Sequence, residues 1–337
     1  MEFHSFKEVN KYAENLIIST AEGDDNIQVW EPKTLAVFGS LKEPSGIPPH
    51  CIDYFHNNTD HIAFTLYKTN ALYFKQISHP ENPPTISRVG HVITCVKTIR
   101  KGHIIAVGTN DGVLILWQSF SGKMVRTLDD MHKSALSFIE CTSMGDIIAT
   151  GSQDMMIKIW SFADLCNMSQ RPSPMVYYNA HVMEITGITL GRYGSCYSSS
   201  HDGTFKVWNI FNFINKCVKE IRMEDKITAF CVDYEEKNVY IGTEKGHINK
   251  RGMWDDSCIE KMANKITALC ISTDGLFVIS GDYQGLIIVW STALEKLKEC
   301  RVHKTTISSI GAYIRPVHLY GLNNNSKSYN LYEPKTL

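Results

Sequence analysis

Short apolar segments that end in tryptophan recur along the chain. Five of them lie at residues 27–30, 114–117, 157–160, 205–208 and 287–290. Trp117 and Trp160 are 43 residues apart, and the two widest gaps between these tryptophans, 87 and 82 residues, are close to twice that spacing. A fixed period of this size indicates a structural repeat, so each wide gap is expected to contain a degenerate copy. We place these copies at residues 71–74 and near Trp254.

Each repeat carries three further segments with the alternation typical of β-strands. An inner segment that begins Ile-Thr or Ile-Ser lies at residues 93–96, 185–188, 227–230, 266–269 and 307–310. A second type is represented by residues 147–152, and a last one, after the tryptophan, by residues 123–128. Four short strands in about 43 residues predict an all-β propeller built from four-stranded antiparallel blades. No segment sustains a helical period, so few helices are expected.

The number of blades depends on how the ends of the chain are treated. Strand-closing aromatic positions occur at Trp30, Phe74, Trp117, Trp160, Trp208, near Trp254, at Trp290 and at Tyr332. The first copy has no clear inner strand before Leu16, so we predict that residues 307–314 complete it. This gives seven blades, with eight as the alternative, and the N- and C-terminal strands share the closing blade. Such closure removes the open sheet edge, and we expect residues 1–337 to form a single domain.

Polar residues recur in phase with the tryptophans. An Asp lies six positions before four of them, and three of these Asp residues have a hydroxyl two positions earlier and a His 20 to 22 positions earlier. The three predicted tetrads are His91, Thr109, Asp111 and Trp117; His132, Ser152, Asp154 and Trp160; His181, Ser200, Asp202 and Trp208. Their donors and acceptors match, so we interpret each tetrad as a network that holds the strands of one blade together.

A catalytic triad is the rival interpretation of Ser, His and Asp residues. A catalytic site occurs once and needs an oxyanion hole, whereas this set recurs at the period of the repeat and includes Trp. We therefore expect a structural role. The remaining repeats are incomplete, because Gln284 replaces Asp before Trp290, Glu22 stands where a hydroxyl would precede Asp24, and residues 241–254 have neither His nor Asp in phase. We expect those blades to be held mainly by apolar packing and backbone ladders.

The Gly90-His91 dipeptide, the three tetrads and the Trp-ended strands resemble the WD-repeat family over essentially the whole chain. A closer similarity runs from residue 147 to residue 250, through Ile159–Leu165, the Pro-containing insert 171–174 and the segment 239–246. This stretch is similar to the WD subunits of the nucleolar complex that processes the internal transcribed spacer of large-subunit ribosomal precursors. The resemblance implies a non-enzymatic scaffold in ribosome maturation, also linked to chromatin licensing before replication.

The resemblance also implies partners and a location. These are an armadillo-like scaffold subunit, a midasin-type ATPase and the pre-ribosomal particle, with the protein in the nucleus or nucleolus. The alternative is another intracellular WD adaptor, such as a ubiquitin-ligase substrate receptor, a coat subunit or a signalling scaffold, in the cytoplasm.

Composition and charge argue against several classes of function. The chain has 34 Lys and Arg against 35 Asp and Glu, so it has no overall field to hold a polyanion, and RNA contact would have to be local. The longest apolar runs fall far below the ~18 residues that a membrane helix needs, and residues 1–10 do not resemble a signal peptide. The ten cysteines show no C-x-x-C spacing, and no phosphate-binding Gly loop is present. We expect no enzyme activity, cofactor, metal, membrane contact or small-molecule substrate.

Basic residues recur just before the inner strands. Lys133, Lys226, Lys265 and Lys304 occupy nearly the same phase in four copies. We hypothesise that they form a basic arc which, with His201, Lys245 and Tyr283 from the turns, meets an acidic peptide or ribosomal RNA. The alternative is a merely solvated rim, since isolated surface charges are common.

Overall fold

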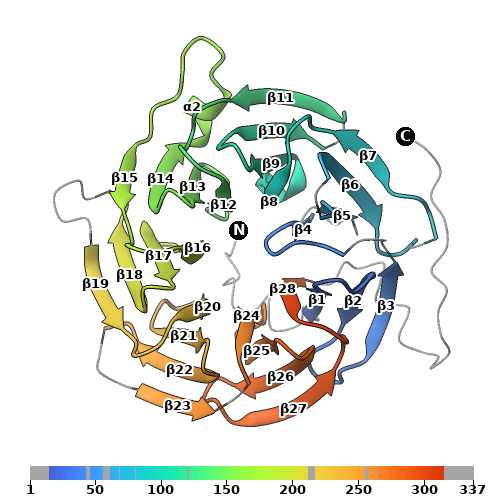
Figure 1. Cartoon of the computed structure of the whole chain (residues 1–337), viewed down its shortest axis with the longest axis vertical. Helices are drawn as coiled ribbons and strands as arrows, with labels where there is room; N and C mark the ends of the chain where they lie inside the picture. Colours follow the sequence, from blue (N-terminus) through green and yellow to red (C-terminus); the bar gives the residue numbers. More distant parts are fainter. Residues whose placement is uncertain are drawn as a thin grey trace, which may run out of the picture.

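The repeats fold into a ring of seven four-stranded antiparallel sheets, seen down its axis in Figure 1. The computed structural model describes residues 15–42, 46–55, 61–67, 69–79, 81–119, 121–211, 217–254, 258–262 and 264–314. We number the sheets as blades in chain order and give the strands of each from the inside of the ring outward.

Blade 1 consists of β28 (Ile307–Ile314), β1 (Asn15–Ala21), β2 (Asn26–Trp30) and β3 (Val37–Lys42). Blade 2 consists of β4 (Ile52–Tyr54), β5 (His61–Phe64), β6 (Ala71–Gln76) and β7 (Thr85–Arg88). Blade 3 consists of β8 (Ile93–Ile99), β9 (Ile104–Thr109), β10 (Leu114–Gln118) and β11 (Lys123–Leu128). Blade 4 consists of β12 (Leu136–Cys141), β13 (Ile147–Ser152), β14 (Met156–Ser161) and β15 (Val176–Asn179).

Blade 5 consists of β16 (Ile185–Leu190), β17 (Ser195–Ser200), β18 (Thr204–Asn209) and β19 (Cys217–Arg222). Blade 6 consists of β20 (Ile227–Val232), β21 (Asn238–Thr243), β22 (His247–Gly252) and β23 (Cys258–Met262). Blade 7 consists of β24 (Ile266–Ile271), β25 (Phe277–Asp282), β26 (Leu286–Ser291) and β27 (Lys296–Arg301). Among the described residues the only helical elements are α2 (Phe162–Cys166) and the 3₁₀ turn η1 (Arg100–Gly102), as the sequence predicted.

The two ends of the chain meet in blade 1. Strand β28 pairs antiparallel with β1 in a register that runs from Asn15 opposite Ile314 to Ala21 opposite Ile307. This pairing confirms seven blades with a shared closing blade, and the alternative of eight is wrong. The predicted last copy at Tyr332 lies outside the described residues.

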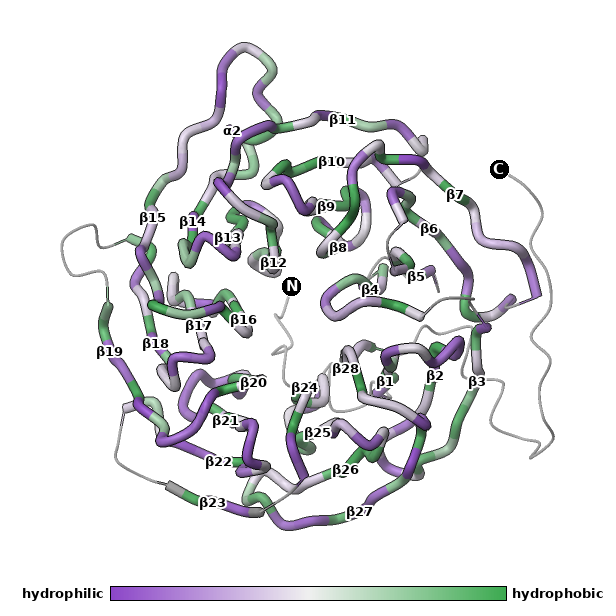
Figure 2. Tube along the Cα trace, in the orientation of Figure 1, coloured by the Kyte–Doolittle hydropathy of each residue, from purple (hydrophilic) through white to green (hydrophobic). Residues whose placement is uncertain are grey.

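Apolar side chains fill the spaces between neighbouring blades. Trp160 of β14 is 2% exposed and packs with Leu114 and Leu116 of blade 3, together with Ile139 of its own blade. Apolar positions fall mainly within strands, whereas many of the connecting turns are hydrophilic (Figure 2). Each blade therefore buries its apolar faces against the neighbouring blades. A single repeat on its own would leave those faces exposed to water.

The degenerate copy that the sequence placed near Trp254 is confirmed as blade 6, whose third strand β22 ends at Gly252, two residues before Trp254. Trp254 itself lies outside the strand and is 62% exposed. Arg251 lies opposite Val239, in the place where Trp160 lies opposite Ile148. Trp254 therefore has the residue type of the repeat but not its position in the strand.

No helix among the described residues is long and apolar enough to cross a membrane.

Candidate functional site

The polar network of blade 4 joins two of its strands, β13 and β14, to the loop before β12 and the turn after β13. His132 Nδ1 lies 3.0 Å from Asp154 Oδ2, and His132 Nε2 lies 2.8 Å from Thr150 Oγ1. The Trp160 indole donates to the same hydroxyl at 2.9 Å. Because the ionised carboxylate can only accept, Nδ1 carries the proton of the neutral imidazole and donates to it, and Nε2 accepts from the Thr150 hydroxyl. Every donor in this network of blade 4 thus has an acceptor when the imidazole is neutral.

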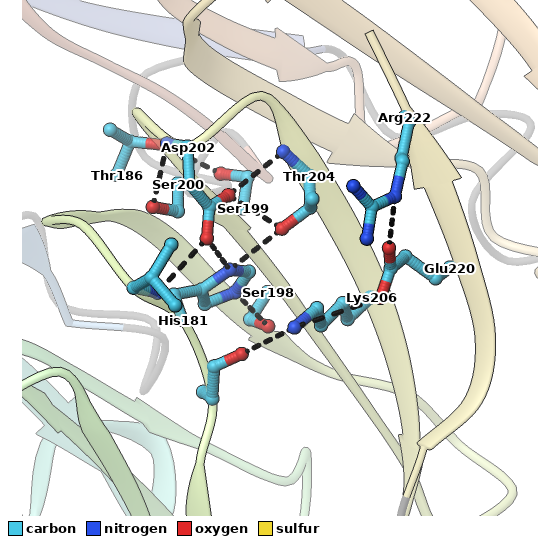
Figure 3. A network of polar contacts seen from close by, with 12 residues as sticks. His181, Thr186, Ser198, Ser199, Ser200, Asp202, Thr204, Lys206, Glu220 and Arg222 are labelled. Atoms are coloured by element: carbon cyan, nitrogen blue, oxygen red, sulfur yellow. Dashed lines mark hydrogen bonds and ion pairs between the residues drawn. The ribbon is translucent and has the colours of Figure 1, made fainter.

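Blade 5 repeats this arrangement, and Figure 3 shows the contacts of His181 with Ser198, Asp202 and Thr204. His181 Nε2 lies 2.8 Å from Ser198 Oγ, to which Trp208 donates at 2.9 Å. His181 Nδ1 lies 3.2 Å from Asp202 Oδ2 and 2.9 Å from Thr204 Oγ1. The network therefore fixes the loop that brings His181 to the middle strands of its blade.

The bridging hydroxyls are not the ones that the sequence predicted. Ser152 and Ser200 instead accept from the backbone N–H groups of Asp154 and Asp202, each at 3.1 Å. Trp160 lies opposite Ile148 in the sheet, so its indole reaches Thr150, two residues before Ser152. Side chains two residues apart share one face of a strand, and sequence spacing alone does not tell them apart.

In blade 3 the predicted tetrad is incomplete. His91 Nδ1 lies 2.7 Å from Asp111 Oδ2, and Thr109 donates to Asp111 Oδ1 at 2.5 Å. Trp117 Nε1, however, has no hydrogen-bond partner among the described residues. Val107 occupies the place that Thr150 holds in blade 4, because Trp117 lies opposite Ile105. The Trp117 indole of blade 3 is therefore buried without a hydroxyl that could accept its N–H.

Blade 1 has a complete network that the sequence did not predict. His303 Nδ1 lies 2.9 Å from Asp24 Oδ2, His303 Nε2 lies 2.9 Å from Ser19 Oγ, and Trp30 donates to Ser19 at 3.1 Å. This network adds to the apolar packing and backbone ladders that were expected to be the main support of the blade. The hydroxyl precedes Asp24 by five positions and the imidazole comes from the other end of the chain, so no local spacing connects them.

Blades 6 and 7 depart further from the pattern. In blade 7 Trp290 donates to Ser280 at 2.8 Å, and Asn264 takes the place of His by donating to Asp282 Oδ2 at 2.7 Å. In blade 6 Ile241 replaces the hydroxyl, and both polar atoms of the buried Asn249 lack partners among the described residues.

The networks keep their histidines neutral and their aspartates ionised. Burial lowers the pKa of His181 to about 4 and also lowers those of His132 and His303, against the carboxylates that would raise them. Burial alone would raise the pKa of Asp154, but the bonds from His132 and backbone N–H groups outweigh it and lower the pKa to about 2. Ser198 is completely buried, so its hydroxyl is out of reach of a substrate.

The predicted partner residues lie on one face of the ring. We call it the front face, formed by the loops that lead into the inner strands and by the turns between the second and third strands of each blade. Main-chain bonds join the two kinds of loop, as from Glu244 N–H to Lys226 O at 3.0 Å and from Tyr283 N–H to Lys265 O at 3.2 Å. Lys133, His201, Lys245 and Lys304 lie on equivalent loops of this face.

The front-face lysines do not form an unopposed basic arc. Lys226 Nζ and Lys265 Nζ both pair with Glu244, at 3.4 and 2.8 Å. His201 lies 3.6 Å from Glu184, and the Lys245 N–H donates to Asp225 at 2.6 Å. Acidic residues from the same loops therefore balance the charge of two of the four lysines, Lys226 and Lys265.

A second polar cluster lies on the inner strands of four adjacent blades. Asp53 of β4 accepts from the backbone N–H and the hydroxyl of Thr98, at 2.7 and 2.8 Å, and from Tyr313 of β28 at 3.2 Å. Lys97 Nζ of β8 lies 3.0 Å from Glu140 Oε2 of β12. Burial would lower the pKa of Lys97, but Glu140 and Asp53 raise it well above its usual value. The described residues contain no group of His, Cys, Asp and Glu that could hold a metal ion.

The insert between α2 and β15 is tied to the neighbouring blade. Arg126 of β11 donates to the main-chain oxygens of Leu165, Asn167 and Gln170, at 2.9, 2.5 and 2.7 Å. A cavity of about 480 Å³ lies between this insert and β11, with Leu128 and Met131 among its lining residues. No residue of the predicted partner set lines it.

Comparison with known proteins identifies the repeat. The model of the WD domain, G-beta repeat, matches residues 122–161, 173–209 and 257–291. These segments cover strands of blades 3 to 7, including the tryptophan strands of blades 4, 5 and 7.

Curated relatives share only part of this sequence. The chain is 28% identical over 238 residues to Protein ROOT INITIATION DEFECTIVE 3 of Arabidopsis thaliana, covering 65% of this chain and 51% of that protein. It is 22% identical over 289 residues to the pre-rRNA-processing protein crb3/ipi3 of Schizosaccharomyces pombe, covering 71% of this chain and 64% of that protein. The chain thus spans between about half and two thirds of the length of these relatives.

A solved structure supports the fold. The computationally designed Ika8 protein superposes with a TM-score of 0.64 at 18% identity, over 90% of this chain and 94% of that one. The likeness concerns the arrangement of blades alone. Together with the repeat match and the blade networks, it shows that the chain is a WD40-repeat propeller protein with distant homology to the IPI3/crb3 pre-rRNA-processing proteins.

Proposed function

We propose that this protein is a non-enzymatic scaffold in maturation of the large ribosomal subunit, acting in the processing of a pre-rRNA spacer. The observation that carries the proposal is its similarity to a pre-rRNA-processing protein over 289 residues. Propellers present many loops on a rigid ring, which suits a protein that holds partners together. The recurring Ser, His and Asp residues support this role, because the blade networks use them to join strands.

The proposed partners are an armadillo-like scaffold subunit and a midasin-type ATPase that the complex recruits to the precursor particle. We place these contacts in the nucleolus and on the front face, where the loops of neighbouring blades lie next to one another. RNA contact there would be local, because Glu244 already pairs with Lys226 and Lys265. Changing Lys133, Lys226, Lys265 and Lys304 together to Glu tests the original basic arc, and unaltered binding of partner and RNA would reject it.

Depletion of the protein from the cells that produce it tests the proposed function. We expect precursors that retain the internal spacer to accumulate, and a tagged copy to sediment with precursors of the large subunit. Restoring the full chain should reverse the defect. Normal spacer processing after depletion, with the tagged copy absent from precursor particles, would contradict the proposal and favour another WD adaptor role.

A further inference from the structure

Met155 has a backbone conformation that methionine rarely adopts. It follows Asp154 in the turn between β13 and β14, and its φ is +65°. The equivalent residues of blades 3, 5, 6 and 7 are glycines with positive φ, namely Gly112, Gly203, Gly246 and Gly285. At Gly112 and Gly285 an added Cβ would collide with the main-chain oxygen of His132 or His303. A side chain retained at such a position points to a function outside the turn itself.

The Met155 side chain is exposed, and the loop that hydrogen-bonds to its turn carries two other exposed apolar side chains. Val182 is 79% exposed, Met183 is 43% exposed and Met155 is 40% exposed. The Ala180 N–H donates to Met155 O at 3.1 Å, and the Val182 N–H donates to Asp202 Oδ2 at 3.1 Å. The first bond holds the start of the loop between β15 and β16 against the Met155 turn, and the second holds the next part of that loop against the turn between β17 and β18. We call Met155, Val182 and Met183 the methionine patch.

A positive charge lies next to this patch. The Lys133 N–H donates to Asp154 Oδ2 at 3.1 Å, which places Lys133 beside the residue that precedes Met155. The Lys133 side chain is exposed and forms no ion pair with the part of the chain that the structure describes. Lys158 lies close by, and burial lowers its pKa, with the charges of Lys133 and Arg171 acting in the same direction and that of Asp154 in the opposite one. The Asp154 carboxylate stays ionised but its side chain is only 8% exposed and accepts from the neutral His132, so the charge exposed on this side of the patch is the Lys133 ammonium.

Negative charge marks the opposite side. Glu184 follows Met183, and its carboxylate, 56% exposed, lies 3.6 Å from His201 Nδ1. A phosphate chain that crossed the patch would meet this carboxylate, whereas a peptide can place one acidic side chain near Lys133 and avoid it. Exposed apolar patches flanked by charge are typical of protein contacts, and methionine adapts its shape to the partner that it meets.

We propose that the methionine patch and Lys133 bind an extended segment of a partner protein in which an apolar side chain lies next to an acidic one. The apolar side chain rests on Met155, Val182 and Met183, and the carboxylate pairs with Lys133. This inference rests on the proposed scaffold function and gives the chemistry of one contact.

Selection from a library of random short peptides displayed on phage tests the site with the full chain as target. We expect the enriched peptides to carry an aliphatic or aromatic residue next to Asp or Glu. A synthetic copy of the strongest should bind about tenfold more weakly to Val182→Ser and Met183→Ser variants. Lys133→Glu should change the selected charge from acidic to basic, which a merely structural role would not do.

Met155→Gly separates binding from stability. Because glycine tolerates positive φ, this variant should have a higher melting temperature while binding the peptide about tenfold more weakly. Asp130→Gly is the matched control, since Asp130 also has a positive φ, +55°, at a site 84% exposed. It should bind the peptide as the parent chain does.

The inference is wrong if no peptide is enriched, if the enriched peptides lack acidic residues, or if Met155→Gly binds with unchanged affinity. Binding of single-stranded RNA that these substitutions abolish, with no peptide bound, would assign the surface to RNA and also overturn it. Spacer processing after depletion is a separate readout, so failure of the peptide site and failure of the proposed function are distinguishable.

Discussion

One hydroxyl decides whether the indole of a blade is satisfied. In blades 1, 4, 5 and 7 a Ser or Thr accepts the indole N–H, and in each case it lies two residues beyond the residue paired with the tryptophan. In blade 3 that position is Val107, and the Trp117 N–H is buried without a partner among the described residues. An unpaired buried donor costs about 1–3 kcal/mol.

Val107→Thr should repair this blade. Thr has nearly the shape of Val, and its hydroxyl would lie where Thr150 accepts from Trp160 in blade 4. We expect the free energy of unfolding in urea to rise by about 1 kcal/mol. The reverse change, Thr150→Val, is the control and should lower it, because it leaves His132 and Trp160 without their shared hydroxyl. An equal loss of stability in both variants would contradict the role given to the hydroxyl.

The neutral histidines predict sensitivity to acid. The pKa of His181 is about 4 in the folded protein against 6.5 for an ordinary imidazole, and those of His132 and His303 are lowered too. Between these values the unfolded chain binds more protons, so stability falls as the pH is lowered from about 6.5. The lowered pKa of Asp154 adds a further loss below 3.8. A urea midpoint that stays constant from about pH 7 to about pH 5 would contradict this account.

The sequence predicts most of each network, but its hydroxyl depends on strand register. His, Asp and Trp are found by their spacing because each lies at a fixed place relative to a turn or a strand end. Thr150 and Ser152 lie on the same face of β13, and only the pairing of Trp160 with Ile148 selects Thr150. The methionine patch could not be predicted for another reason, because nothing in the sequence around Met155 indicates that its φ is positive.

At the scale of elements, outer connections between blades are tied by single long side chains. Arg126 extends from β11 to the insert of blade 4 and donates to main-chain oxygens that the short α2 leaves without helical partners. A guanidinium has enough donors to satisfy several carbonyls at once. The Pro-containing insert, which the sequence shows as a break in the repeat, is thereby held against the neighbouring blade.

Arg126→Met should release this insert while leaving the blades intact. The substitution keeps the apolar part of the side chain and removes the donors, so we expect faster cleavage of residues 167–174 by a dilute protease, with little change in melting temperature. Arg222→Met is the matched control, because Arg222 bonds to Glu220 of its own strand at 2.6 Å. Equal cleavage rates in both variants and in the parent chain would contradict the role of Arg126.

At the scale of the whole molecule, the ring depends on contacts between residues that are far apart in sequence. The missing inner strand of the first repeat was enough to predict that β28 completes blade 1. The polar contacts of that closure join residues 284 positions apart. His303 lies four residues before β28, as His132 and His181 lie before β12 and β16, but this relation emerges only once β28 is assigned to blade 1. A second buried pair, Thr20 and Ser308, reinforces the same seam at 2.8 Å.

A double-mutant cycle between Ser19 and His303 tests ring closure most directly. Ser19→Ala, His303→Ala and the double variant are compared by urea unfolding, and the same cycle between Ser19 and His181 of blade 5 is the control. Direct contact predicts a coupling energy of about 1 kcal/mol for Ser19 with His303, and additivity for the control. Additive effects for Ser19 and His303 would contradict a ring that closes through blade 1.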